Sequence, residues 1–316
     1  MASPALWLRA ASAQPRIRRV GVLSQGWAAA HPTPLFHAFQ LGLRDLGWVE
    51  GHNLVLEWRF SEGSFEPLPR LAGELVGLPA DVIVASPTRP ALAAKEATST
   101  IPIVFIQSAD PVETGIVNSL SRTGTNITGL SSIASDLSGK RLELLREILP
   151  GAARVAVLWH RPSQAAAAVF RELERTSAQI GLALEDIGVA EAAELKRAMA
   201  AAVQARVAAV MVVDGPMIAS LQRQIVSLAT ERGLPIISQY ADFAEGGGLM
   251  AYGPSLLEIY RRGAIYVDRI LRGAKPSELP VEQPAVFELV INLRTAKALG
   301  LEVAPTLLAR ATRVIE

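Results

Sequence analysis

Short apolar segments alternate with longer amphipathic segments from one end of the chain to the other. The short segments are rich in β-branched residues, and several are apolar throughout, which is typical of parallel strands buried on both faces of a sheet. The expected strands are 20–23, 54–58, 82–85, 103–106, 155–159, 207–213 and 235–238. The expected helices, with apolar residues every three or four positions, are 35–46, 68–76, 139–149, 164–180, 191–204, 218–231 and 256–271. This repeated alternation predicts a doubly wound α/β architecture.

The alternation starts a second time near the middle of the chain. Arg-Val-x-Val-Leu occurs at 19–23 and again at 154–158, each time ahead of a helix, and the turn-rich stretch 122–138 precedes the second series. We therefore predict two doubly wound parallel-sheet lobes. Ligands of such sheets bind outside the carboxyl ends of the strands, so two facing lobes would enclose one ligand between them.

The composition narrows the class of protein. The 316 residues are 50% hydrophobic and 19% charged, which excludes a disordered chain and suggests about two domains. A formal net charge of +1 argues against a nucleic-acid binder and against a polybasic membrane-surface protein. The chain has no cysteine, which excludes disulfides, thiol nucleophiles and cysteine metal sites. No apolar stretch reaches the length of a membrane span.

Polar and aromatic residues that follow the strand ends are the candidate ligand contacts. They are Ser24, Gln25, Trp27, Ser86, Thr88, Asp110, Trp159, Asp214 and Tyr240. Ser86 and Thr88 stand just before a helix, where hydroxyls and exposed amides can hold a carboxylate; the alternative is that one of them is an ordinary N-cap.

Acidic and aromatic side chains at these positions have two interpretations each. Asp110, Asp214 and also Asp242 follow strands and could meet a cationic group, although Asp-Pro and Asp-Gly are also common turn pairs. Trp27 and Trp159 each follow or end the first strand of a series, so they could stack on a flat ligand across the cleft. Packing at the edge of a lobe is the alternative.

The motifs of familiar catalytic and metal sites are missing. The sequence contains no phosphate-binding Gly-x-x-x-x-Gly-Lys-Ser/Thr loop, no Gly-x-Ser-x-Gly elbow and no His-Glu-x-x-His. Its four histidines, at 31, 37, 52 and 160, show no metal-ligand spacing. We therefore expect no enzyme, no cofactor and no metal.

Several blocks of sequence together point to one family. They are FQLGLRDLGWVEG at 39–51, DVIVA at 81–85, ATSTIPIVF at 97–105, DPV at 110–112, NITGLS at 126–131, GGLMAYGP at 247–254, GAKP at 273–276, LPVEQP at 279–284 and FELVIN at 287–292. Through these blocks the sequence resembles the ABC-transporter solute-binding proteins of the family that includes tryptophan- and tyrosine-binding members, and the similarity runs from about residue 18 to 316. These proteins have the type I periplasmic-binding-protein fold.

The resemblance implies how the chain is divided. The lobes would be joined by crossover strands, with passes near 128–132, 249–252 and 282–290. The N-terminal lobe would comprise 17–130 plus 253–283, and the C-terminal lobe 131–252 plus 284–316. Residues 1–16 would be a signal-peptide remnant or a disordered tail, because Ala11-Ser12-Ala13 before Gln14 is typical of a cleavage site, while Arg9 interrupts the apolar run ahead of it.

The resemblance also implies a function. The chain would capture a small molecule, such as an aromatic or other amino acid, by hinge closure and deliver it to a membrane permease. Ser86 and Thr88 would hold a carboxylate, Asp110 or Asp214 an amino group, and Tyr252 would also lie at a cleft position. The protein would act as a periplasmic monomer without a lipid anchor. A cytosolic ligand sensor of the same fold without a DNA-binding domain, and an enzyme on a doubly wound sheet, are the alternatives.

Overall fold

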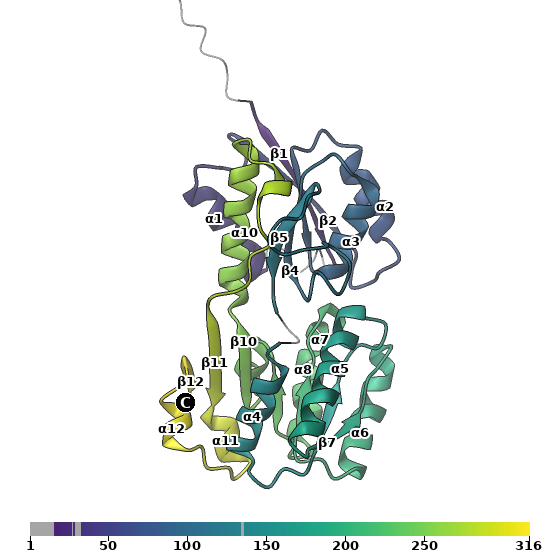
Figure 1. Ribbon diagram of the computed structural model, residues 1–316. Helices are drawn as coiled ribbons and strands as arrows, with labels where there is room; N and C mark the ends of the chain where they lie inside the picture. Colours follow the sequence, from purple (N-terminus) through teal and green to yellow (C-terminus); the bar gives the residue numbers. More distant parts are fainter. Residues whose placement is uncertain (1–15, 27, 29–32, 134–135) are drawn as a thin grey trace, which may run out of the picture.

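The computed structural model describes residues 16–26, 28, 33–133 and 136–316, which form two α/β lobes stacked end to end (Figure 1). Each lobe has its own sheet, and all neighbouring strands except one pair run parallel. The predicted fold class is therefore confirmed. The proposed cleavage site and Trp27 lie outside the described residues.

The N-terminal lobe contains a five-stranded parallel sheet in the order β2-β1-β3-β4-β5. Its strands are β1 (Arg18–Ser24), β2 (Leu54–Phe60), β3 (Val82–Ser86), β4 (Ile103–Ser108) and β5 (Ile127–Ser131). Helices α1 (Pro34–Asp45) and α10 (Leu256–Leu271) pack on one face, and α2 (Leu68–Val76) and α3 (Thr88–Ala97) pack on the other. Because both faces are covered, the central strands are apolar throughout.

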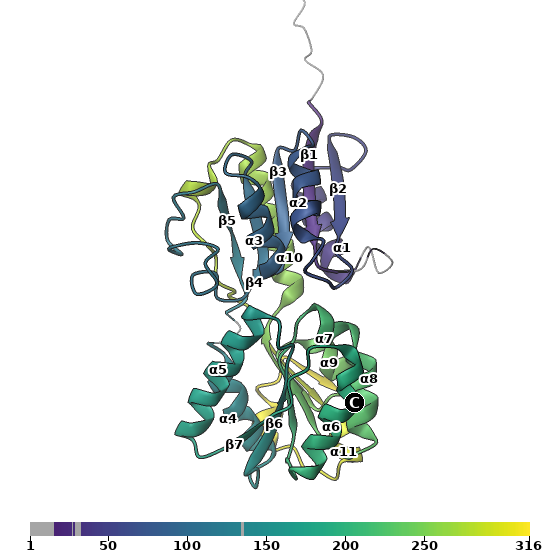
Figure 2. The same cartoon turned by 90° about the vertical axis from the view of Figure 1, so that its right-hand side faces the viewer.

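The C-terminal lobe contains a seven-stranded sheet in the order β12-β11-β10-β9-β8-β6-β7. Its strands are β6 (Arg154–Leu158), β7 (Ala183–Asp186), β8 (Val210–Val212), β9 (Ile236–Ser238), β10 (Met250–Pro254), β11 (Phe287–Asn292) and β12 (Arg313–Ile315), and only β10 and β11 pair antiparallel. One face carries α4 (Ser138–Ile148), α5 (Gln164–Gln179), α11 (Leu293–Ala298) and α12 (Pro305–Leu308). The other carries α6 (Leu195–Gln204), α7 (Pro216–Ser220), α8 (Gln222–Thr230) and α9 (Ala241–Glu245). Figure 2 shows helices on both faces of this sheet.

The expected elements differ from the structure mainly at the sheet edges and at helix starts. β7 and β12 were not expected, because these edge strands are partly exposed and lack a continuous apolar run. β5, β10 and β11 were expected only as passes between the lobes and not as strands of the two sheets. The strand expected over 207–213 shrinks to β8, and the helix expected over 218–231 is broken into α7 and α8 at Leu221. A 3₁₀ turn, Ala192–Glu194, opens the helix that becomes α6.

The chain passes between the lobes three times, after β5, after β10 and before β11. The first and third passes lie side by side, because Ser131 donates its backbone N–H to the carbonyl of Glu282 at 2.8 Å. Two glycines allow neighbouring strands to approach closely at these points. A Cβ on Gly129 would lie 2.0 Å from the Phe105 carbonyl oxygen, and one on Gly253 would lie 1.9 Å from that of Gln239. Neither position has room for a side chain.

Candidate ligand-binding cavity

A cavity of about 410 Å³ lies between the lobes at the carboxyl ends of their strands. The N-terminal lobe contributes residues that follow β1, β3 and β4, and the C-terminal lobe contributes residues that follow β6, β8 and β9. This is where a doubly wound sheet places its ligand, and the volume suits a small organic molecule.

The structure brings most of the sequence-predicted residues to this cavity. Those that line it are Ser24, Gln25, Ser86, Thr88, Asp214 and Tyr240. Asp110, Trp159 and Tyr252 lie outside its lining, and Trp27 lies outside the described residues.

Trp159 and Tyr252 are engaged inside their own lobe. The Trp159 ring stacks on Phe170 with the centroids 4.8 Å apart, and its Nε1 donates to Asp186 Oδ1 at 2.7 Å. Tyr252 packs against the same core, and its carbonyl oxygen accepts a hydrogen bond from Arg141 Nε at 2.9 Å. Trp159 therefore packs within its lobe, which was the alternative to stacking on a flat ligand across the cleft.

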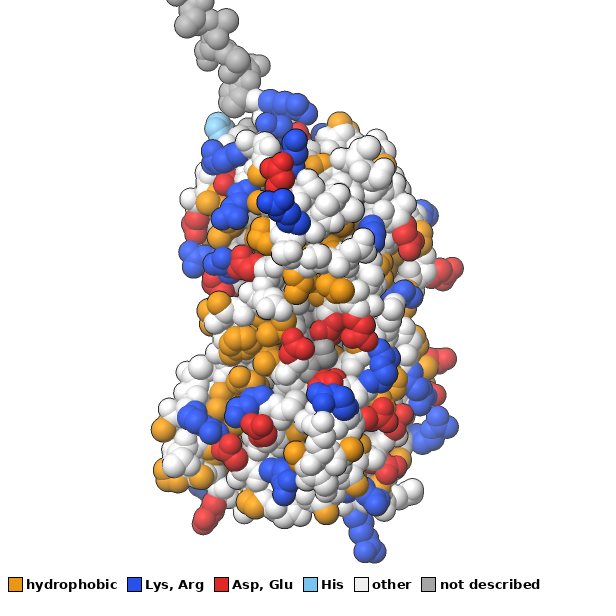
Figure 3. All heavy atoms as spheres, in the orientation of Figure 1, with side chains coloured by type: hydrophobic (Ala, Val, Ile, Leu, Met, Phe, Trp, Pro, Cys, Tyr) orange, Lys and Arg blue, Asp and Glu red, His pale blue; other side chains and the backbone are white. Residues whose placement is uncertain are grey.

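Asp110 faces a different hollow. It lies in the loop after β4 and lines an open groove of about 670 Å³, together with residues of α5 such as Arg171. The groove lies where the two lobes meet, a region called the waist below. The groove is bordered by charged side chains of both lobes, and Figure 3 shows acidic and basic side chains gathered at the waist.

In the N-terminal half of the cavity, the polar side chains are hydrogen-bonded to one another. The Tyr260 hydroxyl lies 2.6 Å from Ser86 Oγ and donates to Gln107 Oε1 at 3.1 Å. Thr88 Oγ1 lies 3.2 Å from Ser108 Oγ and accepts from the Ala109 N–H. The N-cap alternative is therefore wrong, because α3 begins without a side-chain cap and both hydroxyls are used elsewhere.

In the C-terminal half, three hydrogen-bond acceptors converge. Asp214 Oδ1 accepts from the Gly215 N–H at 2.7 Å, and Asp242 Oδ1 accepts from the Phe243 N–H at 3.0 Å. The side chain of Gln239 also lines the cavity, and its buried Oε1 has no donor among the described residues.

Both carboxyl groups have a raised pKa. Burial raises the pKa of Asp214 well above its ordinary value, and the charge of Asp242 raises it further. Burial also raises the pKa of Asp242, whose side chain is the more exposed of the two. A cation between them would relieve both effects.

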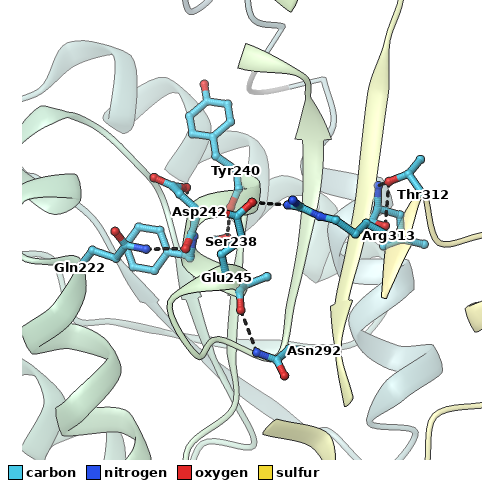
Figure 4. Close-up of polar contacts among 11 residues, drawn as sticks. Gln222, Ser238, Tyr240, Asp242, Glu245, Asn292, Thr312 and Arg313 are labelled. Carbon is cyan, nitrogen blue, oxygen red and sulfur yellow. Dashed lines mark hydrogen bonds and ion pairs between the residues drawn. The ribbon is translucent and has the colours of Figure 1, made fainter. Parts of the chain in front are cut away.

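Hydrogen bonds and an ion pair on the side away from the cavity stabilise the segment that carries Tyr240 and Asp242. Ser238 Oγ donates to the Tyr240 carbonyl at 2.8 Å, and Asn292 Nδ2 donates to the Ala244 carbonyl at 2.9 Å. Arg313 forms an ion pair with Glu245. Figure 4 shows the Tyr240 side chain pointing away from these contacts.

Several contacts cross from one lobe to the other. Tyr240 of the C-terminal lobe hydrogen-bonds the side chain of Gln107 in the N-terminal lobe and that of Ser132 in the first pass between the lobes. Burial raises the pKa of Tyr240 to about 12, so its hydroxyl stays protonated. The rings of Phe65 and His160 lie 5.7 Å apart. Outside the cavity, Arg171 Nη2 lies 2.6 Å from Glu113 Oε1. The lobes are therefore closed onto each other in this structure.

The cavity also contains residues that were not among the expected contacts. Gln107 lies near the end of β4 and His160 follows β6, so the strand-end rule could have included them, whereas Asp242 was already expected as a possible partner of a cationic group. Phe65 and Tyr260 could not be found that way, because one precedes α2 and the other lies within α10.

The described part of the chain has neither a metal-binding cluster nor a helix that could span a membrane. Its His, Asp and Glu side chains form no group of three or more that could hold a metal ion. None of its helices combines the length and the apolar character needed to cross a membrane.

Comparison with known proteins gives consistent matches. Residues 34–315 match the family described as ABC transporter substrate binding protein. A curated tyrosine-binding protein from Clostridioides difficile is 26% identical over 265 residues, which are 84% of this chain and 76% of the relative.

Solved structures match over nearly the whole chain. A conserved domain protein from Vibrio cholerae is 28% identical with a TM-score of 0.88, covering 95% of this chain and 100% of that one. The structure of an ABC domain from Streptococcus pneumonia in complex with L-Trp is 24% identical, also with a TM-score of 0.88, and it covers 95% of this chain and 100% of that one. These likenesses agree with the fold of type I periplasmic binding proteins that the sequence blocks implied.

Proposed function

Because the chain belongs to the family of ABC transporter substrate binding proteins, we propose that it captures an amino acid between its lobes and delivers it to a membrane permease. Members of this family bind substrates and do not transform them, so the expectation that the chain is not an enzyme is confirmed. An aromatic amino acid is the first candidate, since one relative is a tyrosine-binding protein and one structural neighbour holds L-Trp.

The observation that carries the proposal is the convergence of three acceptors on one half of the cavity. Asp214, Asp242 and Gln239 Oε1 offer acceptors, and an ammonium group has three N–H donors. The ligand ammonium would bind here, where it would satisfy a buried oxygen and relieve the repulsion between two carboxylates.

The opposite half would receive the ligand carboxylate. Ser86 and Thr88 bring hydroxyls to this side of the cavity, and the first N–H groups of α3 lie at the same place. Oriented amides at a helix start favour an anion. The apolar part of the ligand would lie against Phe36, Val169 and Val213, which also line the cavity.

Lobe closure would hold the ligand, because the two groups that bind it stand on different lobes. The ligand then stabilises the closed form by contacting both lobes. The proposal includes an exported, periplasmic protein that acts as a monomer on a permease. A cytosolic sensor of the same fold is the alternative, and cell fractionation with uptake of labelled ligand separates the two.

Titration calorimetry with L-tryptophan, L-tyrosine and L-phenylalanine tests the ligand assignment. We expect Asp214→Asn to weaken binding at least tenfold, about 1.4 kcal/mol. Asp45→Asn, at an exposed ion pair on α1, is the matched control and should leave the dissociation constant unchanged. An unaltered constant in Asp214→Asn would remove this residue from the site.

A ligand analogue sharpens the same test. Indole-3-propionate keeps the ring and carboxylate of tryptophan but has no ammonium group. It should bind the wild type weakly, and Asp214→Asn should cost it nothing further. An equal loss for both ligands would mean that Asp214 acts on the fold of the site and not on the ammonium.

A further inference from the structure

Phe65 lines the cavity, is only partly buried, and lies between side chains of two different lobes. The guanidinium carbon of Arg89 lies 4.9 Å from the centroid of the Phe65 ring, and the His160 ring lies 5.7 Å from it with a tilt of 40°. Phe65 and Arg89 belong to the N-terminal lobe, whereas His160 follows β6 of the C-terminal lobe. All three line the cavity.

The charges around this ring suit a packed contact. Among the described residues, no carboxylate forms an ion pair with Arg89, so the face of Phe65 is the partner of its guanidinium. Burial lowers the pKa of His160, which keeps its imidazole neutral near neutral pH. A neutral ring can therefore pack on Phe65 without repelling the arginine on the same aromatic side chain.

Because Phe65 and His160 stand on different lobes, their ring contact links the lobes in this closed structure. We propose that Phe65 is a gate that closes the mouth of the cavity, held in position by Arg89 and docked on His160 of the opposite lobe. The gate stabilises the closed form and slows the escape of the ligand. The effect of the Phe65 gate on ligand escape rests on the proposed function, whereas its effect on lobe closure is independent of that function.

Spin labels on the two lobes test the gate without any ligand. The chain has no cysteine, so Glu96→Cys on α3 and Lys196→Cys on α6 provide two exposed labelling sites in an otherwise unreactive protein. Pulsed electron spin resonance then measures the distance between the lobes. Phe65→Ala and His160→Ala should both move the distribution toward longer distances, whereas Phe65→Tyr, which keeps the ring, should match the parent protein.

The kinetic consequence is measured by stopped-flow fluorescence with L-tryptophan. Phe65→Ala should raise the dissociation rate at least fivefold and change the association rate much less. A distance distribution that is the same in Phe65→Ala and in the parent would overturn the gate. Absence of L-tryptophan binding to the parent would instead count against the aromatic ligand, and the spin-label distances would still decide the gate.

Discussion

The two halves of the cavity satisfy their polar groups in different ways. In the N-terminal half, Ser86, Tyr260 and Gln107 form a chain of hydrogen bonds that is complete without a ligand. In the C-terminal half, Asp214 and Asp242 repel each other, and Gln239 Oε1 is buried without a donor among the described residues.

The difference indicates where a ligand gains most of its binding energy. A buried polar group without a partner costs about 1–3 kcal/mol, and a ligand that supplies the partner recovers that cost. The N-terminal half has little to recover, so it presents a fixed surface that orients the ligand. In the proposed complex, the C-terminal half would therefore contribute most of the affinity, and the N-terminal half would orient the ligand.

Displacing the C-terminal half of the cavity as a unit should have the largest effect on stability and ligand binding. Gly253→Ala would place a Cβ 1.9 Å from the Gln239 carbonyl oxygen, so β9 and the turn after it must shift. We expect a loss of stability of about 3 kcal/mol, the upper end of the usual range, and a loss of ligand binding. Urea unfolding and calorimetry measure the two effects.

Gly151→Ala is the matched control for that substitution, because a Cβ at Gly151 would meet nothing within 4 Å. It should change neither stability nor binding appreciably. Tight ligand binding by Gly253→Ala would show that the position of the C-terminal half matters less than we infer.

The hydroxyl chain of the other half is tested by Tyr260→Phe. The substitution removes the oxygen that links Ser86 to Gln107 and leaves their buried polar atoms unpaired. We expect a loss of about 1–2 kcal/mol in the free energy of unfolding. Equal stability of Tyr260→Phe and the wild type would contradict the view that this network is complete in the empty protein.

Much of the fold could be predicted from the sequence because buried parallel strands and amphipathic helices have clear periodicities. The expected helices 68–76 and 256–271 coincide with α2 and α10. β7 and β12 were missed since edge strands need no continuous apolar run.

The site could be predicted only in part, because the strand-end rule gives position along the chain and not the direction of a side chain. It selects Asp214 and Tyr240, which line the cavity, and equally Trp159, which turns onto Phe170. Tyr260 and Phe65 reach the cavity through tertiary packing of α10 and of the segment before α2, and no local pattern encodes that.

The repulsion between Asp214 and Asp242 in the C-terminal half of the cavity predicts that the stability of the empty protein depends on pH. Burial and Asp242 raise the pKa of Asp214 in the folded protein, while the unfolded value stays near 3.9. The folded state therefore binds this proton more tightly, and stability falls as the pH rises from the unfolded pKa through the folded one. Asp214→Asn removes the effect, so the empty variant should be more stable than the wild type at pH 8.

Urea unfolding at pH 4 and pH 8 measures this gain. The difference between variant and wild type should be small at pH 4, where the unfolded chain also takes up the proton, and larger at pH 8. A wild type more stable than Asp214→Asn at pH 8 would mean that the carboxylate pair is compensated within the empty protein.

The smallest effect on ligand affinity is expected from an ion pair between the lobes that lies outside the cavity. Glu113 and Arg171 pair across the waist, but their side chains are 53% and 60% exposed, so solvent and salt screen the attraction. Arg171→Ala should weaken ligand binding by no more than about fivefold, because an exposed pair contributes about 0.2–1 kcal/mol to the closed form. The loss should shrink further at 0.5 M salt, and exchanging the two charges by Glu113→Arg with Arg171→Glu should restore affinity. A different result would be that Arg171→Ala weakens ligand binding as much as Asp214→Asn does, with no reduction of the loss by salt. In that case the ion pair between the lobes would control affinity, and the two halves of the cavity would not.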